Sequence, residues 1–250
     1  MPLFESESLV LRSYDLSEAD RIIVFFTREH GLIRGVAKGA KRLKSRFGST
    51  LEPFSTVNLS YFQKEDRELV SIQGVELIRS RFGVASHPET LGTYAYLASL
   101  LMALLPPHDP NQTAYRMANA CLDAEPEGPD ELAVVRLYFE LWLLHLGGYL
   151  PDWSRCCECR RPLLSAEAAA LHSDLTLLCS SCGRTRRIPS VSVLERDLFQ
   201  AARSVAPAAF VERAGRHVET VRDLSGILRT IVVNVVGHDL MNEPALAVKL

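Results

Sequence analysis

The sequence predicts an α+β protein, in which a small five-stranded β-barrel precedes an α-helical domain with an inserted four-cysteine zinc finger. Three patterns support this prediction. Short β-branched and aromatic runs fill the first 80 residues, apolar residues then recur at helical spacing, and two C-x2-C pairs interrupt the helical part. We therefore divide the chain into residues 1–80 and residues 81–250, with the zinc-binding insertion at residues 153–190.

The predicted strands are short and follow one another closely. Five such runs within about 80 residues suit a small barrel. Their order, a single strand, a hairpin, a long loop and a second hairpin, is compatible with an OB-fold. The strands are expected at residues 8–14, 21–27, 32–37, 57–63 and 69–78.

Apolar residues recur every three or four positions in the second part of the chain. Residues 111–124 place small and apolar side chains on one helical face. Residues 129–146 are apolar on most sides, which predicts a buried helix, and Gly147 and Gly148 follow as a C-terminal stop. Residues 224–236 repeat the helical spacing. The second domain is therefore expected to be helical.

The bulk composition limits the possible classes of protein. Of the 250 residues, 47% are hydrophobic and 23% are charged, which is ordinary for a globular protein, and the net charge of -2 excludes a uniformly basic nucleic-acid binder. We find no secretory signal and no apolar run long enough to span a bilayer. The expected location is the cytoplasm, where thiols stay reduced, and no membrane association is expected.

Two pairs of cysteines have the spacing of a metal site. Cys156 and Cys159 form one C-x2-C, Cys179 and Cys182 form another, and nineteen residues separate the pairs. Each such turn directs two thiolates at one point, so two turns complete a tetrahedral zinc site. Four protein ligands leave no open position, so the predicted Zn2+, one per chain, is structural. Unrelated buried cysteines, disulfides or a redox pair are the alternatives, and the clustering and the reducing compartment argue against them.

The first of these pairs is irregular. Cys157 could replace Cys156 as a ligand, which would give a C-x-C arrangement. The usual zinc knuckle also has a glycine after its second cysteine. Gly183 fits this pattern in the second pair, whereas Arg160 occupies the corresponding position in the first. The sequence leaves both ligand sets open.

A basic segment lies between Leu32 and Leu51. It contains six basic residues and no acidic one, so the rest of the chain is clearly acidic. A flexible loop with lysine and arginine can follow a phosphate backbone and release its counterions. The alternative is a solvated loop without a ligand, but the neighbouring barrel and the exclusion of acidic residues favour phosphate binding. The candidate DNA-binding residues are Arg34, Lys38, Lys41, Arg42, Lys44 and Arg46.

Two aromatic residues near the barrel are candidates for stacking on nucleic-acid bases. Phe47 is the better candidate, because it interrupts the basic run. Tyr61 fits the core of the barrel equally well.

No combination of residues indicates an enzyme. The motifs H-E-x-x-H, G-x-S-x-G and G-x-G-x-x-G are absent, and residues 31–39 lack the order of a P-loop. A zinc-dependent enzyme that modifies nucleic acids would need the H-x-E…P-C-x2-C arrangement with an open metal position, which is missing. We therefore expect a binding protein without catalytic residues.

Several of these segments together resemble one known family, the RecO recombination mediators. The similarity spans nearly the whole chain and is densest over residues 8–62. It also includes the junction between the helix at 129–146 and the cysteines. The segments that carry it are LVLRSY at 9–14, SEAD at 17–20, FTREHG at 26–31, VAKGAKR at 36–42, LEPF at 51–54, FEL at 139–141, GY at 148–149 and GHDL at 237–240.

The resemblance implies an N-terminal OB-fold, a helical C-terminal domain and a zinc insertion. It also implies a role in DNA repair and recombination, in the cytoplasm and associated with the nucleoid. Members of the family bind single- and double-stranded DNA and anneal complementary strands. With RecR, they help to load RecA onto DNA coated by single-stranded DNA-binding protein (SSB). The alternative is a zinc-containing protein-interaction module that does not bind DNA.

The resemblance further implies that the helical domain receives the acidic, apolar C-terminal tail of SSB. A receptor for such a tail needs an apolar groove with a cation at one end. The predicted helix at 129–146 is largely apolar, and Arg136 is its only arginine. Arg136 is therefore our candidate for the SSB-tail site. The alternative is that its side chain simply extends to solvent.

Overall fold

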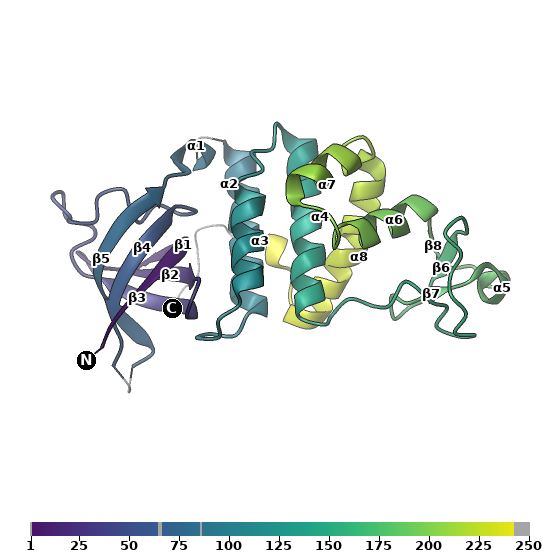
Figure 1. The fold of residues 1–250 in the computed structure, drawn as a ribbon, viewed down its shortest axis with the longest axis horizontal. Helices are drawn as coiled ribbons and strands as arrows, with labels where there is room; N and C mark the ends of the chain where they lie inside the picture. Colours follow the sequence, from purple (N-terminus) through teal and green to yellow (C-terminus); the bar gives the residue numbers. More distant parts are fainter. Residues whose placement is uncertain (1, 65–66, 86, 243–250) are drawn as a thin grey trace. The chain divides into compact units, whose positions relative to one another are not determined.

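The structure, a computed structural model, describes residues 2–64, 67–85 and 87–242 (Figure 1). The chain divides into two compact units, Met1–Asp123 with Leu240–Leu250, and Ala124–Asp239. The last strand of the barrel ends at Arg79, and three helices follow within the first unit. The change from strands to helices and the division between compact units therefore fall at different places in the chain.

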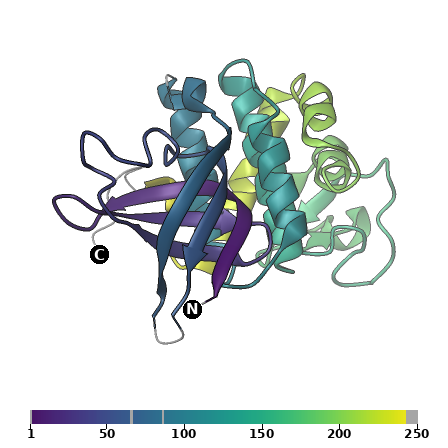
Figure 2. The same cartoon turned by 60° about the vertical axis from the view of Figure 1, so that its left-hand side comes forward.

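The first unit contains a closed five-stranded barrel with the strand order β1-β2-β3-β5-β4 (Figures 1 and 2). Neighbouring strands are antiparallel, except that β3 and β5 are parallel. This is the OB-fold arrangement, so the predicted fold of this part is confirmed. The strands are β1 (Leu3–Asp15), β2 (Arg21–Thr27), β3 (Gly31–Ala37), β4 (Thr56–Phe62) and β5 (Leu69–Arg79).

Strand β1 is longer than predicted because it pairs with two neighbouring strands. Its first part, from Leu3 to Leu9, pairs with β4, and its second part, from Ser8 to Asp15, pairs with β2. The register shifts between Val10 and Arg12, where an extra residue bends the strand. The sequence does not predict this extension, because the start of β1 is polar and lacks an apolar run.

The barrel interior is filled by side chains from all five strands and from the loop between β3 and β4. Two of the buried residues, Phe47 and Leu51, come from that loop. Because apolar burial is the main stabilising term in folding, these two side chains fix the loop to the barrel. The core consists of Val10, Ile23, Phe25, Ile33, Ala37, Phe47, Leu51, Val57, Leu59, Tyr61, Val70 and Ile72.

Helices α1 (Phe82–Ala85), α2 (Pro88–Leu104) and α3 (Gln112–Leu122) and the 3-10 turn η1 (Leu240–Asn242) complete the first unit. The predicted helix at 111–124 is confirmed, and the Asn111 side chain caps it by accepting a hydrogen bond from the Ala114 N–H. Arg81 joins the end of α3 to the barrel. Its guanidinium donates to the Phe54 carbonyl at 2.8 Å and forms an ion pair with Asp123 at 2.5 Å.

The second unit is a helical bundle. Helix α4 (Pro129–Leu146) packs against α7 (Pro207–Ala214) and α8 (Val218–Val236), and α6 (Val193–Ala201) also packs on α8 (Figure 1). The predicted helices at 129–146 and 224–236 are confirmed. Most apolar side chains of α4 are buried, as its composition predicts. Among the described residues, no helix is both long and apolar enough to cross a bilayer.

The cysteine insertion (residues 153–190) interrupts the bundle between α4 and α6. It contains a small sheet of β6 (Ala169–Leu171), β7 (Leu177–Leu178) and β8 (Ser190–Val191), and the short helix α5 (Ser180–Gly183). Trp153 attaches the insertion to α6, because its ring stacks on Phe199 with centroids 4.1 Å apart. The Trp153 indole also donates a hydrogen bond to the Leu175 carbonyl at 2.9 Å.

Candidate metal centre and nucleic-acid interface

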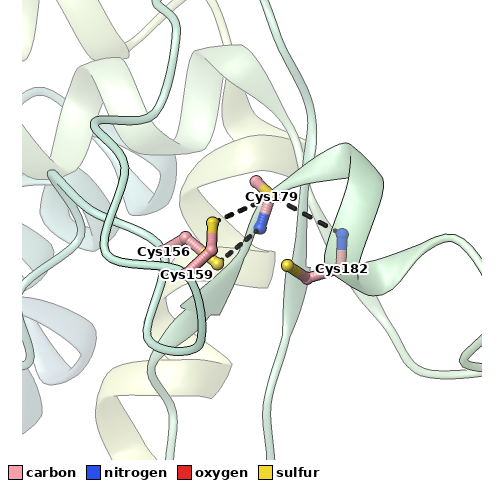
Figure 3. A group of neighbouring side chains, drawn as sticks. All are labelled: Cys156, Cys159, Cys179 and Cys182. Atoms are coloured by element: carbon pink, nitrogen blue, oxygen red, sulfur yellow. Dashed lines mark hydrogen bonds between the residues drawn. The ribbon is translucent and has the colours of Figure 1, made fainter.

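The four cysteines of the two C-x2-C pairs come together at one point (Figure 3). Their sulfur atoms all lie within 4.8 Å of one another, and those of Cys159 and Cys179 are 3.8 Å apart. A tetrahedral zinc with bonds of about 2.3 Å separates its sulfur ligands by about 3.8 Å. The donor set and its spacing therefore fit a structural metal ion held by Cys156, Cys159, Cys179 and Cys182.

Backbone N–H groups donate hydrogen bonds to two of these sulfurs and so stabilise the thiolate form that binds a metal ion. The N–H of Cys182 points at the Cys179 sulfur, at 3.5 Å, and such bonds lower the pKa of the Cys179 thiol. Burial raises the pKa of Cys156, but N–H donors including that of Cys179 outweigh it and bring this pKa to about 6. The pKa of Cys182 is raised to about 12, first by its contact with Cys179. The thiols of Cys156 and Cys179 therefore lose their protons more readily than the thiol of Cys182.

Cys156 contributes its sulfur to this cluster, and Cys157 is not part of it. The backbone N–H of Cys157 instead donates to the Leu177 carbonyl at 2.8 Å, next to the first cysteine turn. The C-x2-C arrangement, and not the C-x-C alternative, therefore supplies the first two sulfur atoms of the cluster.

The residues that follow the two cysteine turns differ in conformation and in packing. In the second turn, a side chain at Gly183 would meet the Cβ of Ala170 at 2.8 Å, so glycine permits this close packing. In the first turn, Arg160 takes the left-handed conformation with φ of 62° and donates its N–H to the Cys156 carbonyl at 3.0 Å. A residue with a side chain is strained there, so the first turn forms in spite of its sequence.

A carboxylate outside the cluster ties the two turns together. Glu167 accepts two hydrogen bonds from Arg161, at 2.8 and 2.9 Å, and one from the Ser180 hydroxyl at 3.1 Å. The bonds from Arg161 are the main reason that the pKa of Glu167 falls to about 2. No motif in the sequence predicts this pair, although Arg161 and Glu167 lie only six residues apart in the segment that precedes β6.

The second candidate site is the basic loop (residues 38–55) with the exposed face of β3. All six predicted DNA-binding residues are exposed there, Arg34 on β3 and the others on the loop. The structure thus exposes every cation that the sequence singled out. Their position beside the barrel follows from the anchoring of the loop by Phe47 and Leu51.

Two of the six cations help to hold the loop in place. The Lys41 ammonium lies 3.0 Å from the Asp15 carboxylate and donates to the Ser17 carbonyl at 3.2 Å. The Arg46 guanidinium donates to the Ile72 carbonyl at 3.1 Å, and its carbon lies 4.8 Å from the centre of the Phe47 ring. Lys41 and Arg46 are therefore partly committed to the protein itself.

The other four cations are free to bind a ligand. Arg34, Lys38, Arg42 and Lys44 form no side-chain hydrogen bond and no ion pair with any residue that the structure describes. Between the last two lies Leu43, whose side chain is fully exposed, at 104%. Sequence reasoning overlooked Leu43, although its position at the centre of the basic run was a usable signal.

The expectation that Phe47 stacks on bases is wrong. Its side chain is 2% exposed and belongs to the barrel core, so it presents no ring to a ligand. The physical reason is that an isolated aromatic residue in a polar loop gains more from burial than from exposure. Tyr61 is 3% exposed and is likewise a core residue, and burial raises its pKa to about 12.

Comparison with known families covers almost the whole chain. A model described as "Recombination protein O N terminal" matches residues 1–81, and one described as "Recombination protein O C terminal" matches residues 85–244. The chain belongs to the recombination protein O (RecO) family. The OB-fold barrel lies within the segment that matches the RecO N-terminal model, and the cysteine insertion lies within the segment that matches the C-terminal model.

Curated RecO relatives support this conclusion. The chain is 35% identical over 209 residues to the DNA repair protein RecO of Syntrophotalea carbinolica, covering 83% of this chain and 80% of the relative. It is 31% identical over 239 residues to that of Rubrobacter xylanophilus, covering 95% and 93%. With the DNA repair protein RecO of Koribacter versatilis, the identity is 35% over 162 residues, and the match spans 65% of that relative's length.

Arg136, the candidate for the SSB tail, lies on α4 of this RecO-family chain. Its side chain is 24% exposed, and its Nε lies 3.9 Å from the carboxylate of the buried Glu140, one helical turn away. The apolar side chains of α4 contribute mainly to the core, because α7 and α8 pack against this helix. A ligand carboxylate at Arg136 would therefore share the guanidinium with Glu140.

Proposed function

We propose that this RecO-family chain is a DNA-repair mediator without catalytic activity, which binds single- and double-stranded DNA through the basic loop and the exposed face of β3. The observation that carries this proposal is the group of four exposed cations without protein partners, Arg34, Lys38, Arg42 and Lys44, beside an OB-fold barrel. Cations of this kind bind phosphates by releasing counterions, with little dependence on sequence.

The anchoring of the loop supports this assignment. The buried Phe47 and Leu51 and the contacts of Lys41 and Arg46 hold both sides of the segment from Arg42 to Lys44. A segment that is already ordered loses less conformational entropy on binding. Leu43 then takes the role that we had given to Phe47, because it is the exposed apolar side chain among these cations and can contact bases.

The metal centre has a structural role in this proposal. Four cysteine sulfurs would hold one zinc ion and leave no position open for a substrate or an activated water. Bound zinc would join the two cysteine turns directly, in addition to the hydrogen bonds of Glu167 with Arg161 and Ser180. Together with the absence of a catalytic motif in the sequence, this supports a function in binding and not in catalysis.

The partners follow from membership of the RecO family. We propose that the protein anneals complementary strands, acts with RecR to load RecA onto SSB-coated DNA, and receives the SSB tail on its helical unit with Arg136 as the cation. Its place of action is then the cytoplasm and the nucleoid. Titration of a labelled SSB-tail peptide against wild type and Arg136→Ala tests the last point, since the variant should bind several-fold more weakly.

A salt titration of DNA binding tests the main proposal. Wild type should bind a labelled single strand with an affinity that falls steeply with salt, and an Arg42→Ala/Lys44→Ala variant should lose about 1.4 units of the slope of log K against log [salt]. Arg116→Ala is the matched control, because Arg116 is an exposed arginine on α3 of the same unit. Failure of wild type to bind DNA would favour the alternative, a protein-interaction module.

A further inference from the structure

The cysteine insertion is rich in arginine. Residues 153–190 contain six arginines and no lysine, against three acidic residues. Each of those acidic residues already has a partner. Glu167 binds Arg161, Glu158 forms an ion pair with Arg186 at 2.9 Å, and Asp174 accepts hydrogen bonds from Thr176. The insertion therefore has no free carboxylate to satisfy its other arginines.

Four arginines remain, and all are exposed: Arg155, Arg160, Arg184 and Arg187. Within the described residues, their side chains form no hydrogen bond and no ion pair. Arg155 is within electrostatic reach of Asp152, whose pKa is lowered mainly by hydrogen bonds from Ser154 and less by Arg155. That distant attraction leaves the guanidinium donors of Arg155 available.

These arginines flank the metal centre on both sides. Arg155 and Arg160 directly precede and follow the first cysteine turn, and Arg184 and Arg187 come two and five residues after Cys182. Since the four sulfurs lie within 4.8 Å of one another, the two cysteine turns meet, and the arginines next to them in sequence belong to neighbouring stretches of backbone. The fold of the insertion thus gathers charges that are far apart in the sequence.

Arg160 provides a second, independent observation. It occupies a left-handed backbone position, with φ of 62°, where glycine is the usual residue. Strain of this kind persists where the surrounding structure enforces it and is often found at binding sites. The cysteine turn enforces this backbone position, because the Arg160 N–H donates to the Cys156 carbonyl, and the exposed side chain is left without a protein partner in the described residues.

We infer that these four arginines form a second binding site for the phosphate backbone of DNA. The inference rests on the proposed function of the basic loop and extends it. Arginine suits phosphate because its planar guanidinium can donate two parallel hydrogen bonds. The two cationic sites belong to different compact units, so one molecule can hold one strand at each of them. Holding two strands in one molecule is what annealing requires.

Charge neutralisation at the metal centre and binding of an acidic peptide are two roles that suit these arginines less well. A cation already lies within electrostatic reach of the cysteines, because Arg161 interacts with Cys179 as well as with Glu167. An acidic peptide tail would need an apolar groove. The cavity of about 410 Å³ beside the insertion has none of the four arginines in its lining, which consists of Ser165, Val193, Leu194, Arg196, Asp197 and Gln200. A phosphate backbone needs only exposed cations.

The experiment uses the full-length protein with an Arg155→Gln/Arg160→Gly/Arg184→Gln/Arg187→Gln variant. Two complementary labelled oligonucleotides report annealing by energy transfer, and one non-complementary strand reports simple binding by anisotropy. We expect the variant to keep its zinc, to bind the single strand within about three-fold of wild type, and to anneal at least ten-fold more slowly. Arg186→Gln is the control, because Arg186 is already paired with Glu158.

The outcomes separate this inference from the proposed function. Unchanged annealing by a zinc-loaded variant would overturn the second site while leaving the basic loop intact, whereas a wild type that does not bind DNA would overturn both. If the quadruple variant loses zinc, Arg184→Gln/Arg187→Gln, which leaves the first cysteine turn unaltered, should still anneal several-fold more slowly. Equal binding of a polyglutamate peptide and of oligonucleotide to this site at the same ionic strength would also contradict phosphate recognition.

Discussion

The basic loop and the cysteine insertion are two irregular segments that are held in shape by different means. The basic loop is anchored from within, because Phe47 and Leu51 are part of the barrel core. The insertion buries few large side chains, and four cysteines gather at its centre instead. A loop can therefore present exposed cations either by placing its own apolar side chains in a neighbouring core or by joining cysteine turns whose sulfurs fit a metal ion.

Loss of the metal should have the largest effect, and it should affect the insertion but not the basic loop. Cys179→Ser should release zinc and unfold residues 153–190, because structural zinc binding supplies on the order of 10 kcal/mol or more to such a site. Hydrogen exchange should show lost protection in the insertion and unchanged protection in the barrel. Cys157→Ser is the control and should retain one zinc per chain. Zinc loss from the Cys157 variant would restore the C-x-C ligand set.

Removal of the internal anchor should have the next largest effect. Phe47→Ala should lower the free energy of unfolding by about 3–5 kcal/mol, because it empties a space in the barrel core. Urea unfolding, followed by barrel-specific hydrogen exchange, measures the change, while the zinc content should stay the same. A loss of DNA binding with no loss of stability would show instead that the ring of Phe47 contacts bases.

The exposed side chain of Leu43 should affect binding but not folding. Leu43→Ala should weaken single-stranded DNA binding by about two- to ten-fold, since apolar contacts with bases are lost, and should leave the salt slope unchanged. Val193→Ala is the matched control, because Val193 is also an exposed apolar residue but lies on α6, outside both the basic loop and the insertion. Equal DNA affinity of wild type and Leu43→Ala would remove this residue from the interface.

The smallest predicted effect is a gain in stability at the first cysteine turn. Arg160→Gly should relieve the left-handed strain and stabilise the metal-bound insertion by about 1 kcal/mol. The measurement is the rate at which a chelator removes zinc, which should fall several-fold relative to wild type. Faster zinc loss would show that the Arg160 side chain itself supports the turn.

The sequence predicted those parts of the structure that depend on local periodicity. The strands at 21–27 and 57–63 and the helix at 129–146 lie where apolar spacing put them, within a residue or two. The motif also predicted that the two cysteine pairs would meet, because two C-x2-C turns can share one metal ion. Other long-range contacts left no such signal. The burial of Phe47 in the barrel and the hydrogen bond from Arg46 to the Ile72 carbonyl depend on the path of the chain in three dimensions.

The sequence predicted which residues form the candidate DNA site, but not which of their charged groups already contact other parts of the protein. All six basic residues are exposed as expected, yet the sequence could not show that Lys41 pairs with Asp15 or that Arg46 binds the Ile72 carbonyl. These contacts form between the loop and strands from either side of it in sequence. They separate anchoring cations from free ones, and that distinction sharpens the choice of variants.

Hydrogen exchange of the full-length protein, with and without a saturating single-stranded oligonucleotide, tests the central claim most directly. The account predicts increased protection of residues 38–46 in the DNA complex, because the backbone around Arg42 and Lys44 becomes covered. The protection should disappear as salt dissociates the DNA. Saturated DNA binding with unchanged exchange across residues 38–46 would contradict the account, since the DNA would then lie elsewhere on the protein.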